Sequence, residues 1–305
     1  GIIVHIGRGS VVILNVILYS ILTGWFLFAS VGFPDYEIYG IYIGQSGEKY
    51  KTELLFSYLL KFINSIGGGA SILYFMAWLS WSVSIYLILK RYNVYYFKTA
   101  FYFSLLNPGS LLLLQLPRYT LSSAVILLMV KTKIFRSIFI LIISLSLHYI
   151  SAILVAIRLA QHVTIKSIFK FNFSALILML LFFSVIWVVL LPEFEKMNTL
   201  YDMYLDLGDK TNRLLFLAII SLMLIYLSKG SGIERNMEYL SLVFLILAAI
   251  YIPHASRFIM TLLPLYVAIS SRYRHFGVNR YVYFSIIVAS LVFSLVIVIF
   301  SLYSY

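Results

Sequence analysis

Long apolar runs separated by short polar segments fill most of the chain. Residues 11–31, 70–89 and 281–302 are each long enough, at about 1.5 Å per residue, to cross a hydrocarbon layer of about 30 Å. The pattern predicts about ten to twelve membrane helices, several of them short, in one all-α domain. The further helices that we expect cover 98–116, a short segment that opens at Pro117, 172–191, 214–227, 239–252 and 258–270.

Two of the apolar runs contain a break or have two interpretations. Asn107-Pro108-Gly109 lies inside 98–116, and we expect a kink there because proline removes a helix hydrogen bond. Residues 137–157 could form one continuous helix, which would place the following basic residues outside the membrane. They could instead form a broken, re-entrant pair that turns near His148, which places those residues inside. We favour the broken form because cytoplasmic segments are usually basic.

The segment between the first two long spans is polar and mixed. A tyrosine-rich loop at 33–42 follows the first span, and a short amphipathic run occupies 54–66. As a helix this run reaches only about 20 Å, so we expect it to lie in the membrane interface. The glycines at 67–69 then form a hinge before the next span.

Composition places the chain among integral membrane proteins. Of its 305 residues 62% are hydrophobic and 11% are charged, whereas only about half of a soluble globular protein is apolar. The sequence has no cysteine, which excludes disulfides, thiolate metal sites and cysteine nucleophiles. No small-residue cleavage site follows the first apolar run, so we expect that run to be a retained span.

The net charge of +12 is distributed as short basic clusters between apolar runs. This arrangement indicates the positive-inside rule and an anionic leaflet, and we expect no nucleic-acid partner. Charge counting places Lys90, Lys98 and Lys131 on the cytoplasmic side. It places the first outer loop, 33–66, and the acidic loop, 193–212, outside.

On this topology several ionisable residues approach the outer face. Arginines there suit a diphosphate, because a planar guanidinium makes permanently charged, bidentate contacts. A nearby carboxylate could take a proton from an attacking hydroxyl. The combination indicates glycosyl transfer from a lipid diphosphate, although each residue could also be an interfacial anchor or a satisfied core side chain. The residues are Asp35, Glu53, Arg118, His148, Arg213, His254 and Arg257.

Other catalytic machinery is missing from the sequence. It contains no Walker loop, no GxGxxG after a strand, no HExxH and no His/Asp cluster at metal-ligand spacing. The carboxylates of the acidic loop are irregularly spaced, and we interpret them as a solvated face. We therefore expect neither a metal nor a cofactor.

Three motifs in order carry a family resemblance. Asp35-Tyr36-x-x-Tyr39 follows the first span, Arg118-Tyr119-x-x-Ser122-x-Ala124 opens a short helix, and Leu147-His148-Tyr149-x-Ser151-Ala152 comes third. The first half of the chain thus resembles the EpsG-like group of Wzy-type bacterial polysaccharide polymerases. The family often has an arginine shortly before the aspartate, and this chain has Val31-Gly32-Phe33-Pro34 there.

The resemblance implies a GT-C-like fold with interfacial helices in the first outer loop. It implies a multi-pass polymerase of the bacterial cytoplasmic membrane that joins oligosaccharide repeat units carried on undecaprenyl diphosphate. A chain-length regulator and a flippase are candidate partners. The alternatives are another lipid-linked-sugar transferase or ligase, and a lipid-linked oligosaccharide flippase.

Within this hypothesis the residues take separate roles. Asp35 is the expected general base, with Glu53 and His148 as alternative catalytic residues. The expected substrate-binding residues are Tyr36, Tyr39, Arg118, Tyr119, Arg213, His254 and Arg257.

Overall fold

The structure is a computed structural model that describes residues 8–33, 35–45, 53–94, 96–128, 134–148, 219, 221, 255–270 and 288. The described residues form helices and no strand. The helices are α1 (Arg8–Ser30), α2 (Tyr36–Gly44), α3 (Leu54–Ser65), α4 (Ala70–Arg91), α5 (Phe97–Leu106), α6 (Pro108–Leu114), α7 (Pro117–Leu127), α8 (Ile134–Leu147) and α13 (Ala255–Ser270).

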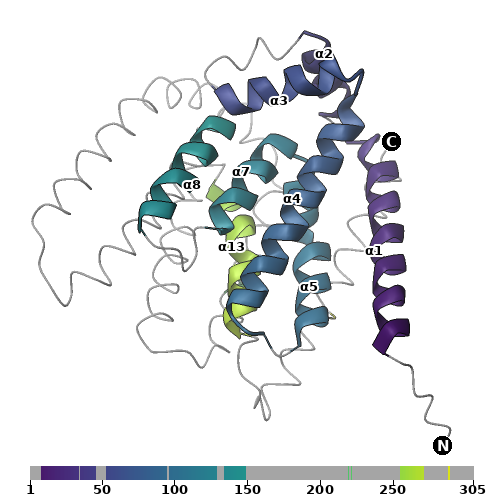
Figure 1. Cartoon of the computed structure of the whole chain (residues 1–305), viewed down its shortest axis with the longest axis vertical. Coiled ribbons are helices and arrows are strands. Elements are labelled where there is room, and N and C mark those ends of the chain that lie inside the picture. The colour runs from purple at the N-terminus through teal and green to yellow at the C-terminus, as the bar shows by residue number, and fades with distance from the viewer. Residues whose placement is uncertain are drawn as a thin grey trace, which may run out of the picture.

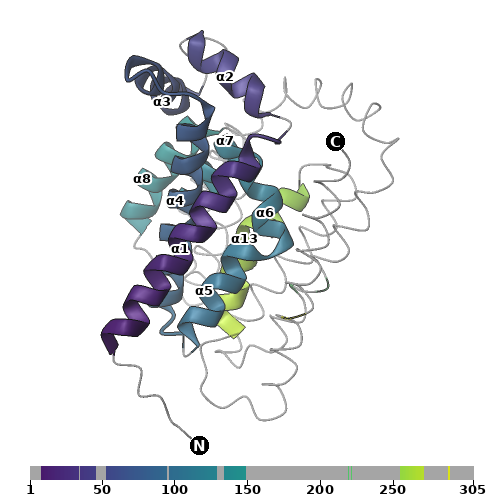
Figure 2. The same ribbon diagram turned by 90° about the vertical axis from the view of Figure 1, so that its right-hand side faces the viewer.

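Most of the longer helices run side by side along one axis, whereas α2 and α3 lie across one end of the bundle (Figures 1 and 2). We call that end the capped end. At the opposite end α4 finishes with Lys90 and Arg91, and α5 begins with Phe97 followed by Lys98. We call it the basic end. The chain passes from one end to the other in α1, in α4, in α5 with α6, in α7 and in α8.

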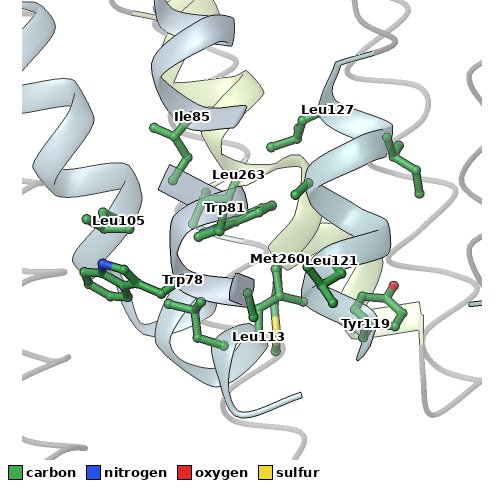
Figure 3. Packing of buried hydrophobic residues seen from close by; sticks show 14 of the residues in the cluster. Trp78, Trp81, Ile85, Leu105, Leu113, Tyr119, Leu121, Leu127, Met260 and Leu263 are labelled. Carbon is green, nitrogen blue, oxygen red and sulfur yellow. The ribbon is translucent and has the colours of Figure 1, made fainter. Parts of the chain in front are cut away.

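The core forms where α4 packs against α7 and α13. Trp78 and Trp81 of α4 are fully buried, and Figure 3 shows Trp81 among Leu263 and Met260 of α13 and Leu121 of α7. Burying aromatic side chains of this size is a large source of packing energy. The tryptophans therefore fix α4 as the central helix.

Small hydroxyl residues let α7 approach its neighbours closely. Ser84 of α4 donates to the Ala124 carbonyl at 2.8 Å, and Ser123 shares a hydrogen bond of 2.8 Å with Thr261 of α13. A third contact joins Ser122 to Ser144 of α8, also at 2.8 Å. Small residues and interhelical hydrogen bonds of this kind hold helices together in an apolar environment.

The expected break at Asn107 is present and its hydrogen bonding is satisfied. The Asn107 amide donates to the carbonyls of Phe103 at 3.1 Å and Ser104 at 2.8 Å, and its oxygen accepts from the Ser110 N–H at 2.9 Å. One buried side chain thus bonds to groups on both sides of the interruption between α5 and α6. Irregular backbone in an apolar interior requires this kind of substitute.

The turn from α3 into α4 depends on two of the hinge glycines. Gly67 has φ +68°, in the left-handed region that favours glycine. A Cβ on Gly68 would lie 2.5 Å from Cδ1 of Ile72 and 3.0 Å from the Ile63 carbonyl oxygen. This close approach lets α3 fold back across the end of the bundle.

Two described helical segments, Val12–Ser30 and Ala70–Arg91, are long and apolar enough to cross a membrane by length and composition. They differ in burial, because more than half of the second segment is buried and almost none of the first is. The apolar side chains of α1 are exposed on nearly all sides, as Val12, Leu14 and Ile21 illustrate.

Several expected helices are confirmed, and one expectation is wrong. The helices expected at 11–31, 54–66, 70–89 and 258–270 are present as α1, α3, α4 and α13, and the short helix opens at Pro117. The tyrosine-rich loop is instead largely helical, forming α2, because Tyr39 and Ile43, four residues apart, are both buried against the bundle.

The break expected near His148 also has a counterpart, since α8 ends at Leu147. The second arm of the proposed re-entrant pair lies outside the described residues. So do the acidic loop 193–212 and, apart from the single helical residues 219, 221 and 288, the helices expected at 172–191, 214–227, 239–252 and 281–302.

Candidate functional site

Glu53 is the centre of a buried ionic cluster at the capped end. It is the residue before α3, only 1% of its surface is exposed, and its side chain does not cap that helix. Its carboxylate instead reaches two other helices. A carboxylate in such a position requires partners, because removing a charge from water is strongly unfavourable.

Arg118 is the first partner. It is the second residue of α7, directly after Pro117, and its Nη1 donates to Oε2 of Glu53 at 3.0 Å. A cation in the first turn of a helix faces the positive end of the helix dipole, so the Glu53 carboxylate offsets an unfavourable placement. One quarter of the Arg118 side chain remains exposed. The guanidinium is therefore anchored to Glu53, and part of the Arg118 side chain remains at the surface.

His148 is the second partner. It follows the last residue of α8, and its Nδ1 lies 2.7 Å from Oε1 of Glu53. Since a carboxylate only accepts hydrogen bonds, Nδ1–H is the donor. The His148 ring is buried and meets the edge of the Tyr119 ring at a centroid distance of 5.5 Å. Each oxygen of Glu53 thus holds a different helix.

The cluster ties together three elements that are distant in sequence. Glu53 is separated by 65 residues from Arg118 and by 95 residues from His148. The contacts join the start of α3 to the start of α7 and the end of α8. Loss of Glu53 would therefore release both Arg118 and His148 from their shared anchor.

A second group of polar side chains surrounds Tyr74 near the start of α4. Tyr36 stacks on Tyr74 with ring centroids 5.7 Å apart, and its hydroxyl hydrogen bonds to Ser71. Tyr39 is buried and packs edge-on against Tyr74 at 6.4 Å. Both tyrosines of the first motif therefore pack around Tyr74.

Asp35 itself is half-buried and does not cap α2. It occupies the position before the first helical residue, where an aspartate usually accepts a backbone N–H, yet its side chain makes no such bond. Its backbone carbonyl accepts from the Tyr39 N–H at 2.9 Å. The carboxylate is thus not used to start the helix.

Two contacts connect this group to the Glu53 cluster. Tyr39 packs edge-on against Phe56 of α3 at 6.2 Å, three residues after Glu53. The Tyr74 hydroxyl donates to the Gln115 carbonyl at 3.2 Å, just before α7 and Arg118. Asp35, Glu53, Arg118 and His148 therefore share the capped end, as the charge pattern predicted.

The structure describes less of the other expected site residues. Arg257 lies in the first turn of α13, which begins on the side of the core where α7 begins (Figure 3), but its side chain is outside the description. Arg213 and His254 lie outside the described residues. Among the residues that are described, no three His, Asp or Glu side chains form a group that could hold a metal ion.

Sequence reasoning missed the contribution of Tyr74 and the pairing inside the Glu53 cluster. Tyr74 lies within a long apolar helix, and no local polarity marks it. Glu53 and His148 were both expected, but as alternatives to Asp35 and not as partners of one another. The sequence contains one signal for the pairing of Glu53 with His148: a charged side chain in an apolar interior needs a partner.

Comparison with protein families, with characterised proteins and with solved structures gives no match to this chain.

Proposed function

We propose that this protein is a multi-pass glycosyltransferase of the bacterial cytoplasmic membrane, a polymerase that joins lipid-diphosphate-linked oligosaccharide repeat units at the outer face. The observation that carries the proposal is the Glu53 cluster, in which a buried carboxylate holds a partly exposed arginine at 3.0 Å. Such an arginine is preorganised for a diphosphate, because its own orientation is fixed before the ligand arrives.

The distribution of charge supports the membrane placement. The basic end carries Lys90, Arg91 and Lys98, which suit the cytoplasmic side, and the capped end would then face outward. Interfacial helices across the outer end, here α2 and α3, agree with a GT-C-like layout. The order of the three motifs in the sequence supports the polymerase assignment among such enzymes.

We assign the general base to Asp35 and a positioning function to Glu53. Both oxygens of Glu53 are engaged, by Arg118 and His148, and the residue is buried. Asp35 is half-buried and its carboxylate is not used in helix capping. A base must reach the proton that it removes, and Asp35 meets that requirement better.

The reaction follows from these positions. Asp35 takes the proton from a hydroxyl of the acceptor sugar, and the hydroxyl oxygen forms a bond to the anomeric carbon of the donor. The bond from that carbon to the diphosphate breaks, and the diphosphate leaves with the electron pair. Arg118 stabilises the negative charge that develops on the leaving group.

The test is polymer synthesis by purified protein in proteoliposomes supplied with defined undecaprenyl-diphosphate repeat units, with and without a chelator. We expect a ladder of products in both conditions. Asp35→Asn should lower the rate by about 10²–10⁴-fold, the range for loss of a general base. Arg118→Lys should lower it by about 10²-fold, because lysine cannot make the planar bidentate contact.

Glu37→Gln is the matched control for Asp35→Asn, because Glu37 is exposed on α2 two residues further along. It should retain the ladder. An Asp35→Asn protein that still makes long chains would remove Asp35 as the base. A single addition in place of a ladder would indicate a transferase or ligase, and transport without a new glycosidic bond would indicate a flippase.

A further inference from the structure

An open apolar groove runs between α1, α4 and α5 toward the basic end. Its volume is ≈ 550 Å³, within the range of about 300–1,000 Å³ that is usual for small-ligand sites. It lies away from the Glu53 cluster, since its residues on α4 begin at Leu79 and end at Tyr86, whereas α4 begins at the capped end with Ala70. The groove is therefore separate from the proposed catalytic site.

The walls of the groove are apolar and partly exposed. Leu79, Val83 and Tyr86 form one stripe along α4 and are 42%, 47% and 45% exposed. Facing them, Val12 and Val16 of α1 are 62% and 60% exposed. In water such a double stripe would be unfavourable, at roughly 25 cal/mol for each Å² of apolar surface.

Aromatic rings shape the groove. The rings of Tyr19 and Phe101 lie 6.5 Å apart across α1 and α5, and Tyr86 meets Phe97 edge-on at 5.3 Å. The Tyr102 hydroxyl reaches the Asn15 carbonyl at 3.5 Å, which joins α1 to α5. These contacts join α5 to both α1 and α4 along the groove.

One lysine lines this apolar surface. Lys98, in the first turn of α5, is exposed and belongs to the groove, and Lys90 lies at the same end of the bundle. A lysine can keep its ammonium group at the membrane surface while its stem lies along apolar side chains. The Lys98 ammonium group would therefore be placed to bind the phosphate of a lipid whose acyl chain lies in the groove.

The length of the groove agrees with a lipid of one leaflet. From Leu79 to Tyr86 the rise along α4 is about 10 Å at about 1.5 Å per residue. One leaflet of a bilayer has a hydrocarbon depth of about 15 Å, half of about 30 Å. An acyl chain that enters at the basic end would therefore stay within one leaflet.

We propose that this groove binds an anionic glycerophospholipid of the inner leaflet, with an acyl chain between α1, α4 and α5 and its phosphate at Lys98. The proposal rests on the membrane placement in the proposed function and not on the reaction. Such a lipid would connect α1 to the rest of the bundle, to which few buried side chains otherwise hold it. Its binding is measured without any glycosyl transfer.

The test is native mass spectrometry of the delipidated protein titrated with phosphatidylglycerol or phosphatidylcholine. We expect one phosphatidylglycerol molecule to be retained in preference to phosphatidylcholine. Lys98→Gln should weaken phosphatidylglycerol binding roughly fivefold, the effect of one surface lysine on an anionic lipid, and should remove the preference. Lys61→Gln is the matched control, because Lys61 is an exposed lysine on α3 at the capped end, and it should bind like the unaltered protein.

A second variant tests the groove itself. Val83→Trp places a large side chain between the walls and should abolish retention of both lipids, while circular dichroism shows unchanged helix content. Equal binding of the two lipids by the unaltered protein, or equal effects of Lys98→Gln and Lys61→Gln, would overturn the headgroup contact. Lipid retained by Val83→Trp, or crosslinking of two chains through Val83→Cys, would overturn the assignment of the groove to a lipid.

Discussion

The charged residues at the two ends of the bundle differ in burial and in pairing. At the capped end Glu53 and His148 are buried and paired with one another, and Arg118 joins them. At the basic end Lys90, Arg91 and Lys98 are exposed. Buried charges must be paired and exposed ones need not be, so the same residue types have different energetic importance at the two ends. A count of charges therefore indicates which residues lie at the same end of the bundle, but not which of them are buried and paired.

The strongest test of this comparison is whether the ends lie on opposite sides of a membrane. The chain has no cysteine, so single cysteines report without background. In intact bacterial cells an impermeant maleimide should label Ser65→Cys at the end of α3 completely. It should label Lys90→Cys only after the membrane is permeabilised. Labelling of both positions in intact cells, or the reverse order, would contradict the proposed orientation.

The next largest effect should come from removing one arginine at each end. Arg118→Met leaves the buried Glu53 carboxylate with His148 alone, and we expect a loss of about 3 kcal/mol in the free energy of unfolding. Arg91 is exposed and donates to the Leu128 carbonyl at 2.6 Å, so Arg91→Met should cost about 1 kcal/mol. Denaturant unfolding in detergent, followed by tryptophan fluorescence, measures both.

A double variant separates loss of the pair from loss of packing. Adding Glu53→Gln to Arg118→Met removes the unpaired charge and should recover part of the stability. The contradicting result is that Glu53→Gln lowers the free energy of unfolding of the Arg118→Met protein by as much as it lowers that of the unaltered protein. The ion pair would then not be what holds α3, α7 and α8 together.

A smaller effect is expected where α3 folds over the capped end. Gly68→Ala places a Cβ 2.5 Å from Cδ1 of Ile72 and 3.0 Å from the Ile63 carbonyl oxygen, so the turn must shift. We expect a cost of about 1–3 kcal/mol, typical of overpacking. Gly24→Ala in α1 is the control, because nothing lies within 4 Å of its Cβ, and it should change stability by less than about 1 kcal/mol. Thermal unfolding in detergent compares the two, and equal midpoints would contradict the close approach at Gly68.

The smallest effect compares the two left-handed residues of the described chain, one at each end. Gly67 has φ +68° and Asn93 has φ +50°. Alanine at either position should cost about 1 kcal/mol, because a Cβ disfavours this conformation. Asn93→Ala should cost less than Gly67→Ala, since asparagine already carries part of the strain. A larger loss at Asn93, seen as a lower unfolding midpoint, would reverse this order.

Local sequence signals were sufficient for most of the described helices. The apolar run at 70–89, the proline after Asn107 and the hinge glycines each act within a few residues, and each was located correctly. The helix at Tyr36–Gly44 was missed because its stability comes from burying Tyr39 against Phe56 and Tyr74. A loop composition was overridden by tertiary packing.

The candidate site was predictable in membership but not in geometry. Charge counting placed Asp35, Glu53, Arg118 and His148 at one end, and the structure agrees. It could not show that Glu53 bonds to both Arg118 and His148, because those contacts span 65 and 95 residues. Contacts at such separations depend on the path of every helix between them.

These separations also set an order of events during synthesis. The carboxylate of Glu53 leaves the ribosome long before its partners, and at about 5–20 residues per second the 95 residues to His148 take roughly 5–20 s. During that interval Glu53 has to remain hydrated, so α3 cannot yet settle over the bundle. The cluster closes only when α8 is complete. The core is completed later still, because α13 follows α8 in the chain and packs against α4 and α7.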